Sequence, residues 1–217
     1  IGYSYFFLRS LHLMIEAGRQ RRFPADFIDV AHYLTFVPSF FSGPIDRIAR
    51  FRETAAARLT RDDAIEGLYR IGMGVIRKFI FGDALYLWYQ YLSQDTARLD
   101  TWQLWLTYDL MFLYIYFNFS GYTDIAIGMG RLYGWRLCEN FNYPFAARNI
   151  SQFWRSWHMS FTFWLQDYIF TPVARWVSLR VKGSPQSRVI VSMTAGSFAS
   201  MAACGLWHYF EWRMMLW

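Results

Sequence analysis

Long apolar runs with few charges alternate with short polar stretches, and they predict helices that cross a membrane. The longest charge-free run, Val189 to Trp207, has about nineteen residues, which at 1.5 Å per residue nearly matches a hydrocarbon layer roughly 30 Å thick. Its many Gly, Ala and Ser residues favour close packing inside a helix bundle. Other apolar helices are predicted at Ile1–Ile15, at Trp102–Phe119, and at Ile71–Leu92, the last as one long helix or two short ones broken near Gly82 and Asp83.

The segment Phe27–Ile45 differs from these runs because it is shorter, carries Pro38 and two ionisable residues, and leads through Ser42-Gly43-Pro44. Basic clusters flank it on both sides, at residues 19–22 and 47–52. Because positive charge favours the cytoplasmic side, we expect both flanks on the same side of the membrane. We therefore predict a re-entrant segment that lines a cavity, since irregular backbone inside a membrane needs protein or water around it.

Asn149–Tyr168 has the clearest helical periodicity. Apolar residues recur at every third or fourth position, which predicts one helix, or two short ones, at an interface or against the bundle wall. His158 falls at the edge of this stripe, between apolar packing and a polar space. Helix breaks are predicted at Ser42-Gly43-Pro44 and at Ser120-Gly121-Tyr122, where glycine supplies backbone freedom.

Composition narrows the class of protein. Of the 217 residues, 55% are hydrophobic, 22% are aromatic and 18% are charged, which excludes a disordered chain, a collagen and a coiled coil. The net charge of +6 does not indicate nucleic-acid binding, because the basic residues are scattered between apolar runs. Cys138 and Cys204 match neither a disulfide framework nor a zinc pattern. Both ends, Ile1 and Trp217, lie inside apolar stretches, so we expect a piece of a longer protein whose N- and C-terminal helices are missing.

Two of the four histidines are candidates for chemistry. His208 directly follows the charge-free run, and an ionisable group at the end of a span suggests a functional site, although an interfacial histidine beside tryptophans is the alternative. His158 is the second candidate, with a satisfied histidine at the stripe edge as its alternative, while His12 and His32 are expected to be structural. Motifs for metal ligands, a nucleophilic serine and a phosphate loop are absent. Such a site suits general-base transfer of an acyl group to an alcohol.

Five motifs occur in the order seen in membrane-bound O-acyltransferases. They are Phe41–Arg47, Asn118–Gly128, Glu139–Phe145, Phe153–Ser160 and Gly205–His208. Through nearly all of its length, the chain resembles the bacterial branch that contains the D-alanyl-lipoteichoic-acid transferase and the alginate O-acetyltransferase. Two positions depart from the family pattern: Gln166, where relatives commonly have Arg, and Tyr209, where Gly often follows the histidine.

The resemblance implies an all-α, polytopic membrane helical bundle with re-entrant and interfacial helices around a central funnel. Residues 1–217 would form the central and C-terminal-side part of this single domain, in a multi-pass protein of the cytoplasmic membrane. The implied reaction moves an acyl group, D-alanyl in preference to acetyl, from a thioester donor across the membrane to a hydroxyl of a cell-envelope polymer. His208 would be the general base, and His158 would orient the donor carbonyl or stabilise the oxyanion. The resemblance also implies these substrate-binding or funnel-lining positions: Ser42, Pro44, Asp46, Tyr122, Asp124, Asn140, Asn142, Trp154, Arg155 and Asp167.

No resident cofactor or metal is expected. The implied donor is a carrier protein bearing phosphopantetheine, or another acyl thioester, and the implied acceptor is teichoic acid, a polysaccharide or an extracytoplasmic acyl-relay protein. Two basic rims could attract an acidic carrier or anionic lipid headgroups. They comprise Arg47, Arg50 and Arg52, and Arg175, Arg180 and Lys182. A transporter or polymer-export partner without acyl-transfer chemistry is the competing function, because broken helices also build ion pathways; few intramembrane charges and no visible inverted repeat weaken it.

Overall fold

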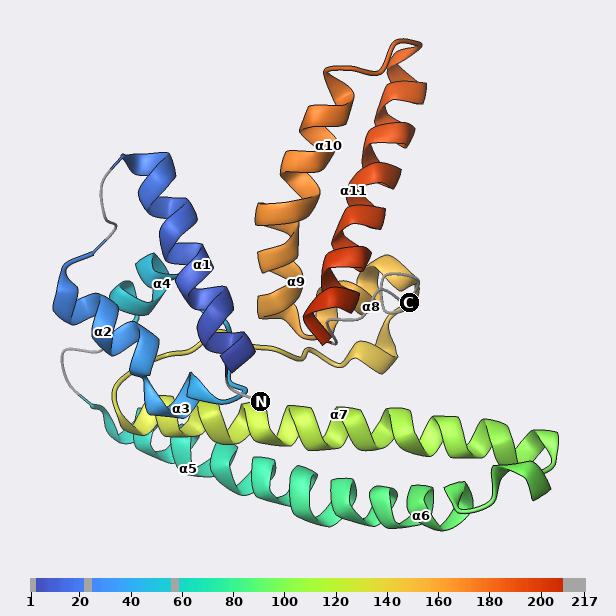
Figure 1. Cartoon of the computed structure of the whole chain (residues 1–217). Helices are drawn as coiled ribbons and strands as arrows, with labels where there is room; N and C mark the ends of the chain where they lie inside the picture. Colours follow the sequence, from blue (N-terminus) through green and yellow to red (C-terminus); the bar gives the residue numbers. More distant parts are fainter. Residues whose placement is uncertain (1–2, 22–24, 56–58, 209–217) are drawn as a thin grey trace. The chain divides into compact units, whose positions relative to one another are not determined.

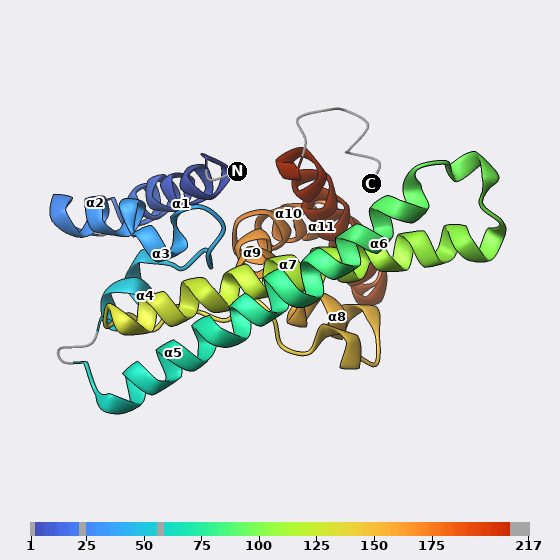
Figure 2. The same cartoon turned by 90° about the horizontal axis from the view of Figure 1, so that it is seen from below.

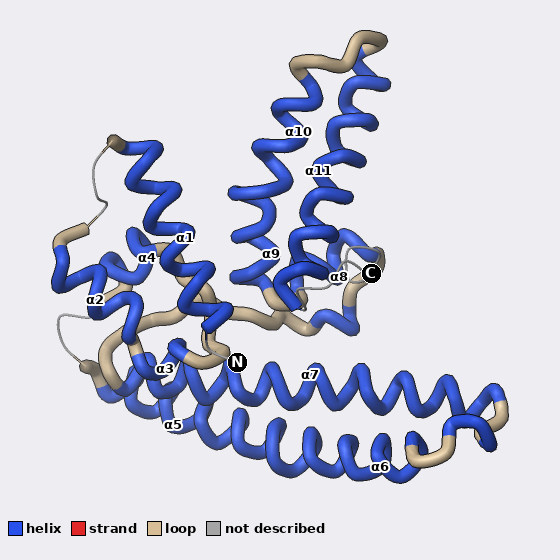
Figure 3. The backbone as a smooth tube through the Cα atoms, viewed as in Figure 1, coloured by secondary structure: helices blue, strands red, loops and turns tan. Residues whose placement is uncertain are grey.

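The computed structural model describes residues 3–21, 25–55 and 59–208, and within them the regular elements are helices (Figure 3). The expected all-α class is thereby confirmed for the described part of the chain. An isolated antiparallel bridge joins Ala55 to Trp135. The chain divides into two compact units, Ile1–Asn140 and Phe141–Trp217.

The first unit begins with four helices around an aromatic core (Figure 1). They are α1 (Tyr3–Gln20), α2 (Phe27–Thr35), α3 (Val37–Phe40) and α4 (Ile48–Glu53). The core holds Leu13, Tyr33, Phe36, Ile48, Phe51, Ile127 and Leu137. Arg22, in the basic cluster before α2, lies outside the described residues.

The predicted re-entrant segment consists of α2, α3 and a non-helical loop. Asp26 starts α2 by accepting a hydrogen bond from the backbone nitrogen of Asp29 at 2.8 Å. Pro38 lies in the first turn of α3, a position where the missing N–H is tolerated. The nine residues of α2 rise only about 14 Å, less than half of a hydrocarbon layer. The predicted break at Ser42-Gly43-Pro44 is confirmed, whereas the path of this segment relative to a membrane stays a prediction.

A long antiparallel helix pair completes the first unit (Figure 2). One side consists of α5 (Arg61–Val75), the π-helix η1 (Ile76–Gly82) and α6 (Asp83–Ser93), and the other is α7 (Thr101–Leu132), after the short 3₁₀ turn η2 (Thr96–Arg98). Capping boxes at Thr60 and Asp100 satisfy the first backbone N–H groups of α5 and α7.

Of the two forms predicted for Ile71–Leu92, the single long helix is confirmed, because the backbone stays helical through Gly82 and Asp83. The break predicted at Ser120-Gly121-Tyr122 is wrong, because α7 continues through it. Glycine serves here as a contact surface instead of a hinge. An ideal Cβ on Gly74 would lie 2.5 Å from the carbonyl oxygen of Gly121, and a Cβ on Gly128 would lie 2.5 Å from that of Gly67. Gly67 and Gly74 lie seven residues apart on α5, and Gly121 and Gly128 lie seven residues apart on α7. The two backbones therefore touch where these glycines face each other.

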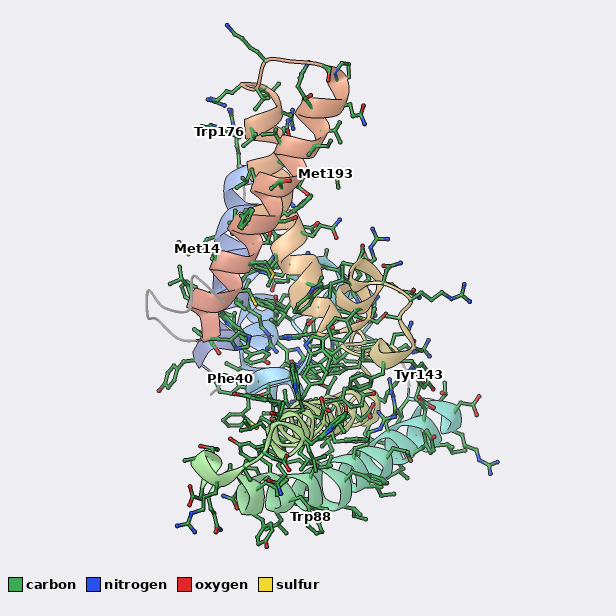
Figure 4. All side chains as sticks on the ribbon, turned by 90° about the vertical axis from the view of Figure 1, so that its right-hand side faces the viewer. Met14, Phe40, Trp88, Tyr143, Trp176 and Met193 are labelled. Carbon is green, nitrogen blue, oxygen red and sulfur yellow. The ribbon has the colours of Figure 1, made fainter. Side chains whose placement is uncertain are left out.

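The second unit contains a short helical turn, two short helices and a long hairpin (Figure 1). Its elements are η3 (Pro144–Ala146), α8 (Ile150–Ser156), α9 (Met159–Leu165), the π-helix η4 (Gln166–Phe170), α10 (Thr171–Ser178) and α11 (Pro185–His208). The second of the two predicted forms, a pair of short helices, is confirmed for Asn149–Tyr168. The single continuous stripe is wrong, because the helix breaks between Ser156 and Met159. Figure 4 shows Trp176 and Met193 on the hairpin, and both side chains are exposed.

Helix α11 agrees with the predicted span Val189–Trp207. Among the described residues, Pro185–His208 is the one helix whose length and apolar composition suffice to cross a membrane, and 22% of its most apolar stretch is buried within the chain. The other predicted spans fall in helices α1, η1, α6 and α7, and their membrane placement stays a prediction.

Candidate functional site

The break between α8 and α9 positions the side chain of His158. Trp157 is extended, and His158 has φ 42° and ψ 53°, a left-handed conformation that costs a non-glycine residue about 1–3 kcal/mol. His158 then starts α9, because its carbonyl oxygen accepts hydrogen bonds from the backbone nitrogens of Phe161 at 3.1 Å and Thr162 at 2.9 Å. The Thr162 hydroxyl donates to the Trp157 carbonyl at 3.1 Å, which fixes the other side of the turn.

Aromatic rings bring the two candidate histidines of the second unit together. The buried imidazole of His158 stacks on Phe161, with ring centroids 5.1 Å apart and planes inclined by 30°. The indole of Trp207 on α11 lies 4.5 Å from Phe161 and 6.0 Å from His158. His208 meets the same indole nearly edge-on, at 4.7 Å and 67°. Trp207 thus contacts both His208, its neighbour in the sequence, and His158, which is distant in the sequence.

Such a pair of imidazoles can divide acid–base work. Histidine has an unperturbed pKa near 6.5, so a neutral ring can accept a proton near physiological pH while a second ring donates a hydrogen bond. His158 is buried and His208, at the end of α11, is exposed.

The other predicted positions of the second unit are spread over three elements. The backbone nitrogen of Asn142 donates to the Ser156 carbonyl at 3.0 Å, while the Asn142 side chain is exposed. Trp154 is half-buried with its ring 5.4 Å from Phe153. Arg155 at the end of α8 and Asp167 in η4 are exposed. Gln166 begins η4, and Tyr209 lies outside the described residues.

The predicted positions Ser42, Pro44 and Asp46 lie in one loop of the first unit, which the rest of that unit binds tightly. Arg9, buried on α1, donates to the carbonyl oxygens of Ser39, of Tyr33 at 3.4 Å and of Pro44 at 3.5 Å. Ser42 is half-buried, and Pro44 is fully buried.

Three further hydrogen bonds hold the end of this loop. The Tyr33 hydroxyl donates to the Asp46 carbonyl at 2.6 Å, and the backbone nitrogen of Ile48 donates to His12 Nε2 at 3.2 Å. The Asp46 carboxylate accepts from the backbone nitrogen of Cys138 at 3.0 Å and pairs with Arg50 at 3.0 Å. Sequence reasoning missed Arg9 as a partner of this loop, because the carbonyls that it binds lie 24 to 35 residues away.

A charged network joins the two long helices of the first unit. The buried carboxylate of Asp124 on α7 pairs with Arg70 at 2.6 Å and with Arg77, and Arg70 also pairs with Glu139. Lys78 donates to Asn118 at 2.5 Å. Sequence reasoning selected Asp124 and missed both arginines, although two arginines seven residues apart on one apolar helix are a detectable signal.

The two remaining predicted positions of this unit are Tyr122 and Asn140. Tyr122, on α7, is half-buried, and Asn140, which ends the unit, is fully buried. The sequence predictions are thus divided between the two units. Across residues 3–21, 25–55 and 59–208, no group of three or more His, Cys, Asp or Glu side chains could hold a metal ion.

A cavity of about 510 Å³ lies between α10 and α11. Its lining includes the apolar residues Phe170, Ala174, Val189 and Met193 and the basic residues Arg175 and Arg188. The guanidinium of Arg180 lies 4.0 Å from the Trp176 ring centroid, and Arg188 donates to the Ser178 carbonyl at 3.2 Å. Basic side chains thus border an apolar cavity.

Comparison with known proteins identifies a family and several similar proteins. The model of the membrane-bound O-acyltransferase (MBOAT) family matches residues 11–217. The chain is 32% identical to the teichoic acid D-alanyltransferase of Bacillus subtilis, over 96% of this chain and 53% of that protein. It is 31% identical to the probable alginate O-acetylase AlgI of Azotobacter vinelandii, over 100% of this chain and 42% of that protein.

A third relative, the peptidoglycan O-acetyltransferase of Helicobacter pylori, is 28% identical over 88% of this chain and 35% of that protein. The chain spans about half or less of the length of these curated relatives. The family match nevertheless covers nearly the whole chain. The chain therefore belongs to the membrane-bound O-acyltransferase family.

Proposed function

We propose that the protein is a multi-pass O-acyltransferase of the cytoplasmic membrane that transfers an acyl group from a thioester donor to a hydroxyl of a cell-envelope polymer. Residues 1–217 are then a central and C-terminal-side part of one membrane domain whose re-entrant and interfacial helices surround a funnel. D-alanyl is the favoured acyl group because of the Ser42–Arg47 and Trp157–Ser160 motifs. Acetyl is the alternative, since the identities to the two kinds of relative are nearly equal, 32% and 31%.

The observation that carries this proposal is the convergence of His158 and His208 on the indole of Trp207. In the proposed reaction, the acceptor hydroxyl oxygen attacks the thioester carbonyl carbon while a nitrogen of His208 takes the hydroxyl proton. The tetrahedral intermediate collapses, the carbon–sulfur bond breaks, and the proton on His208 passes to the departing sulfur. The products are the ester and the free thiol of the donor, and His208 returns to its neutral form.

His158 assists by donating a hydrogen bond to the carbonyl oxygen as negative charge develops there. A donor that is already fixed in a dry site stabilises an oxyanion strongly, because no reorganisation is needed during the reaction. Burial of His158 and its stacking on Phe161 support this role. No covalent intermediate with the enzyme is required.

The donor is proposed to be a carrier protein with a phosphopantetheine thioester, whose flexible arm can reach an embedded site. The basic side chains beside the α10–α11 cavity, Arg175 and Arg188, fit an acidic carrier as well as anionic lipid headgroups. The acceptor is proposed to be teichoic acid, a polysaccharide or an extracytoplasmic relay protein, because the named relatives act on teichoic acid, alginate and peptidoglycan.

Four variants of the two histidines test the reaction in the intact, detergent-purified protein. Release of the donor thiol is measured at one pH and at matched folded concentration. His208→Ala and His208→Gln should both lose about 10² to 10⁴ in rate, since neither residue accepts a proton near neutral pH. His158→Gln, which keeps a hydrogen-bond donor, should retain partial activity, whereas His158→Ala should retain almost none.

The same variants must fold for the result to count, so their thermal unfolding is compared with that of the wild type. More than about a tenth of wild-type activity in folded His208→Ala would refute the general-base role, which should contribute at least about 10². Equal losses in both His158 variants would refute the assigned division of roles between the two histidines.

A further inference from the structure

The aromatic side chains around the two histidines form a connected group whose centre is Trp207. Phe161 is buried and stacks on His158, and the Trp207 indole lies 4.5 Å from Phe161 with the planes inclined by 33°. This distance is at the short end of the range for paired aromatic rings. Helix α9 lies beside the end of α11 at this point (Figure 1). The contact between Phe161 and Trp207 therefore joins the helix that carries one histidine to the helix that carries the other.

The two imidazoles depend on this indole in different ways. His158 is held from one face by Phe161 at 5.1 Å and contacts Trp207 at 6.0 Å. His208 is exposed, stands at the end of α11, and has its ring 4.7 Å from Trp207. An exposed side chain at a helix end samples several rotamers unless a neighbouring group restricts it. The indole therefore contacts both imidazoles, the buried one at the start of α9 and the exposed one at the end of α11.

We propose that Trp207 is a positioning residue that sets the relative placement of the His158 and His208 imidazoles. This inference rests on the proposed acyl transfer, in which one imidazole removes a proton while the other faces the developing oxyanion. His208 must reach the acceptor hydroxyl while His158 reaches the carbonyl oxygen under attack, so the separation of the two imidazoles must match the reacting atoms to within about 0.5 Å. A misplacement of about 1 Å can lower a rate about 10²-fold, so a group that fixes the separation has a large kinetic effect without touching the substrate.

The test compares three substitutions of buried or half-buried tryptophans in the second unit. Trp207→Leu removes the ring between the histidines, and Trp207→Phe keeps an aromatic ring of smaller size. Trp164→Leu is the matched control, because Trp164 is 3% exposed on α9, the helix that His158 starts, and its ring is tilted against that of Tyr168 at 5.0 Å. The control removes a buried indole of the same unit whose described ring contact is with Tyr168.

Two readouts are taken on the intact protein in detergent. Histidine labelled with ¹³C at Cε1 gives resonances that are assigned by His→Gln variants and that report the ring currents of neighbouring aromatic groups. Thiol release with an acyl-thioester donor gives kcat and KM. Trp207→Leu should shift the resonances of both His158 and His208 and lower kcat about 10- to 100-fold, with KM changed less than about threefold. Trp207→Phe should keep kcat within about fivefold of wild type.

Trp164→Leu should leave both resonances in place and kcat within about threefold. Equal kinetic losses in Trp207→Leu and Trp164→Leu would assign Trp207 to general packing and overturn the proposal. Unshifted resonances in Trp207→Leu would overturn it, and so would shifted resonances with an unchanged kcat. A wild-type protein without any transfer would refute the proposed function instead, while the resonances would still show whether the indole places the two rings.

Discussion

The glycine contacts between α5 and α7 allow one stability prediction to be worked out from distances. A methyl group on Gly74 would lie 2.5 Å from the Gly121 carbonyl oxygen and 2.8 Å from the backbone nitrogen of Ile125. Ordinary contact begins near 3.4 Å, so the two backbones would have to separate by several tenths of an ångström. The obstacle is backbone on both sides, and rotation of a side chain cannot relieve it.

The expected magnitude follows from two opposing terms. Overpacking of this kind costs about 1–3 kcal/mol, and we expect the upper end because a rigid helix pair must move. Replacing glycine by alanine inside a helix also contributes about 1 kcal/mol of stability through helix propensity. Gly74→Ala should therefore destabilise the protein by about 2 kcal/mol.

Gly72 on the same helix is a matched control, because a Cβ there has nothing within 4 Å. Gly72→Ala should stabilise the protein by about 1 kcal/mol. The difference between the two variants, about 3 kcal/mol, isolates the steric term, since the propensity term cancels. At about 2–4 °C per kcal/mol, the two melting temperatures should differ by about 6–12 °C.

Thermal unfolding of the intact protein in detergent, followed by circular dichroism, measures this difference. A gap below about 1 kcal/mol would refute the backbone contact, because the propensity term would then act alone at both positions. The double variant Gly74→Ala/Gly121→Ala should lose less than the sum of the two single losses. One separation of the helices accommodates both methyl groups, and neighbouring substitutions are not additive.

Three further predictions concern topology, pH and charge. Cysteines at positions 21 and 50 should be labelled by a membrane-impermeant reagent from the same side, because basic flanks favour the cytoplasmic face; labelling from opposite sides would make Phe27–Ile45 a true span. The Thr60 hydroxyl, with Arg131 and Arg136, lowers the pKa of Asp63 to about 2. The ionised Asp63 carboxylate therefore stabilises the folded state above the unfolded pKa near 3.9, and this stabilisation is lost as pH falls toward 2. The melting-temperature gap between wild type and Asp63→Asn should thus stay constant from pH 7 to pH 5, and a gap that narrows there would contradict the assignment. Asp124→Asn should lower the free energy of unfolding by about 2–4 kcal/mol, measured in urea or by heating, because it leaves Arg70 and Arg77 without their buried partner. Glu139→Gln, at an exposed carboxylate, should lower it by less than about 1 kcal/mol. Equal effects of the two variants would contradict the central role of Asp124 in this network.

Sequence patterns predicted the helices well and their interruptions poorly. Apolar runs are a local property, so Val189–Trp207 and Trp102–Phe119 were found inside α11 and α7. The glycine of Ser120-Gly121-Tyr122 indicated a break, because a residue without a side chain permits a turn. The same lack of a side chain also permits close contact with another helix. Gly121 makes such a contact with Gly74, which lies 47 residues away in the chain, so the local sequence could not reveal it.

The break at His158 is the opposite case, since the two short helices were one of the predicted forms but the apolar stripe gave no sign of where they divide. Neither Trp157 nor His158 is a glycine or a proline, and the apolar spacing continues across them, so periodicity predicted one stripe. The turn exists because its carbonyls are capped by Thr162 and because the imidazole packs on Phe161 and Trp207. Trp207 belongs to another helix, and a local pattern contains no information about it.

Two kinds of contact position the residues predicted for the site. The loop around Pro44 and Asp46 is bound through its carbonyls by Arg9 and Tyr33, through the Asp46 carboxylate by Arg50 and the backbone nitrogen of Cys138, and through the N–H of Ile48 by His12. These bonds stabilise the fold of the loop. The rings of His158 and His208 lie against aromatic side chains, which fix the plane of a ring and leave the choice of proton position to the imidazole. A fold that orients titratable rings by apolar surfaces can change their protonation without breaking the contacts that hold them, as a general base must during each turnover.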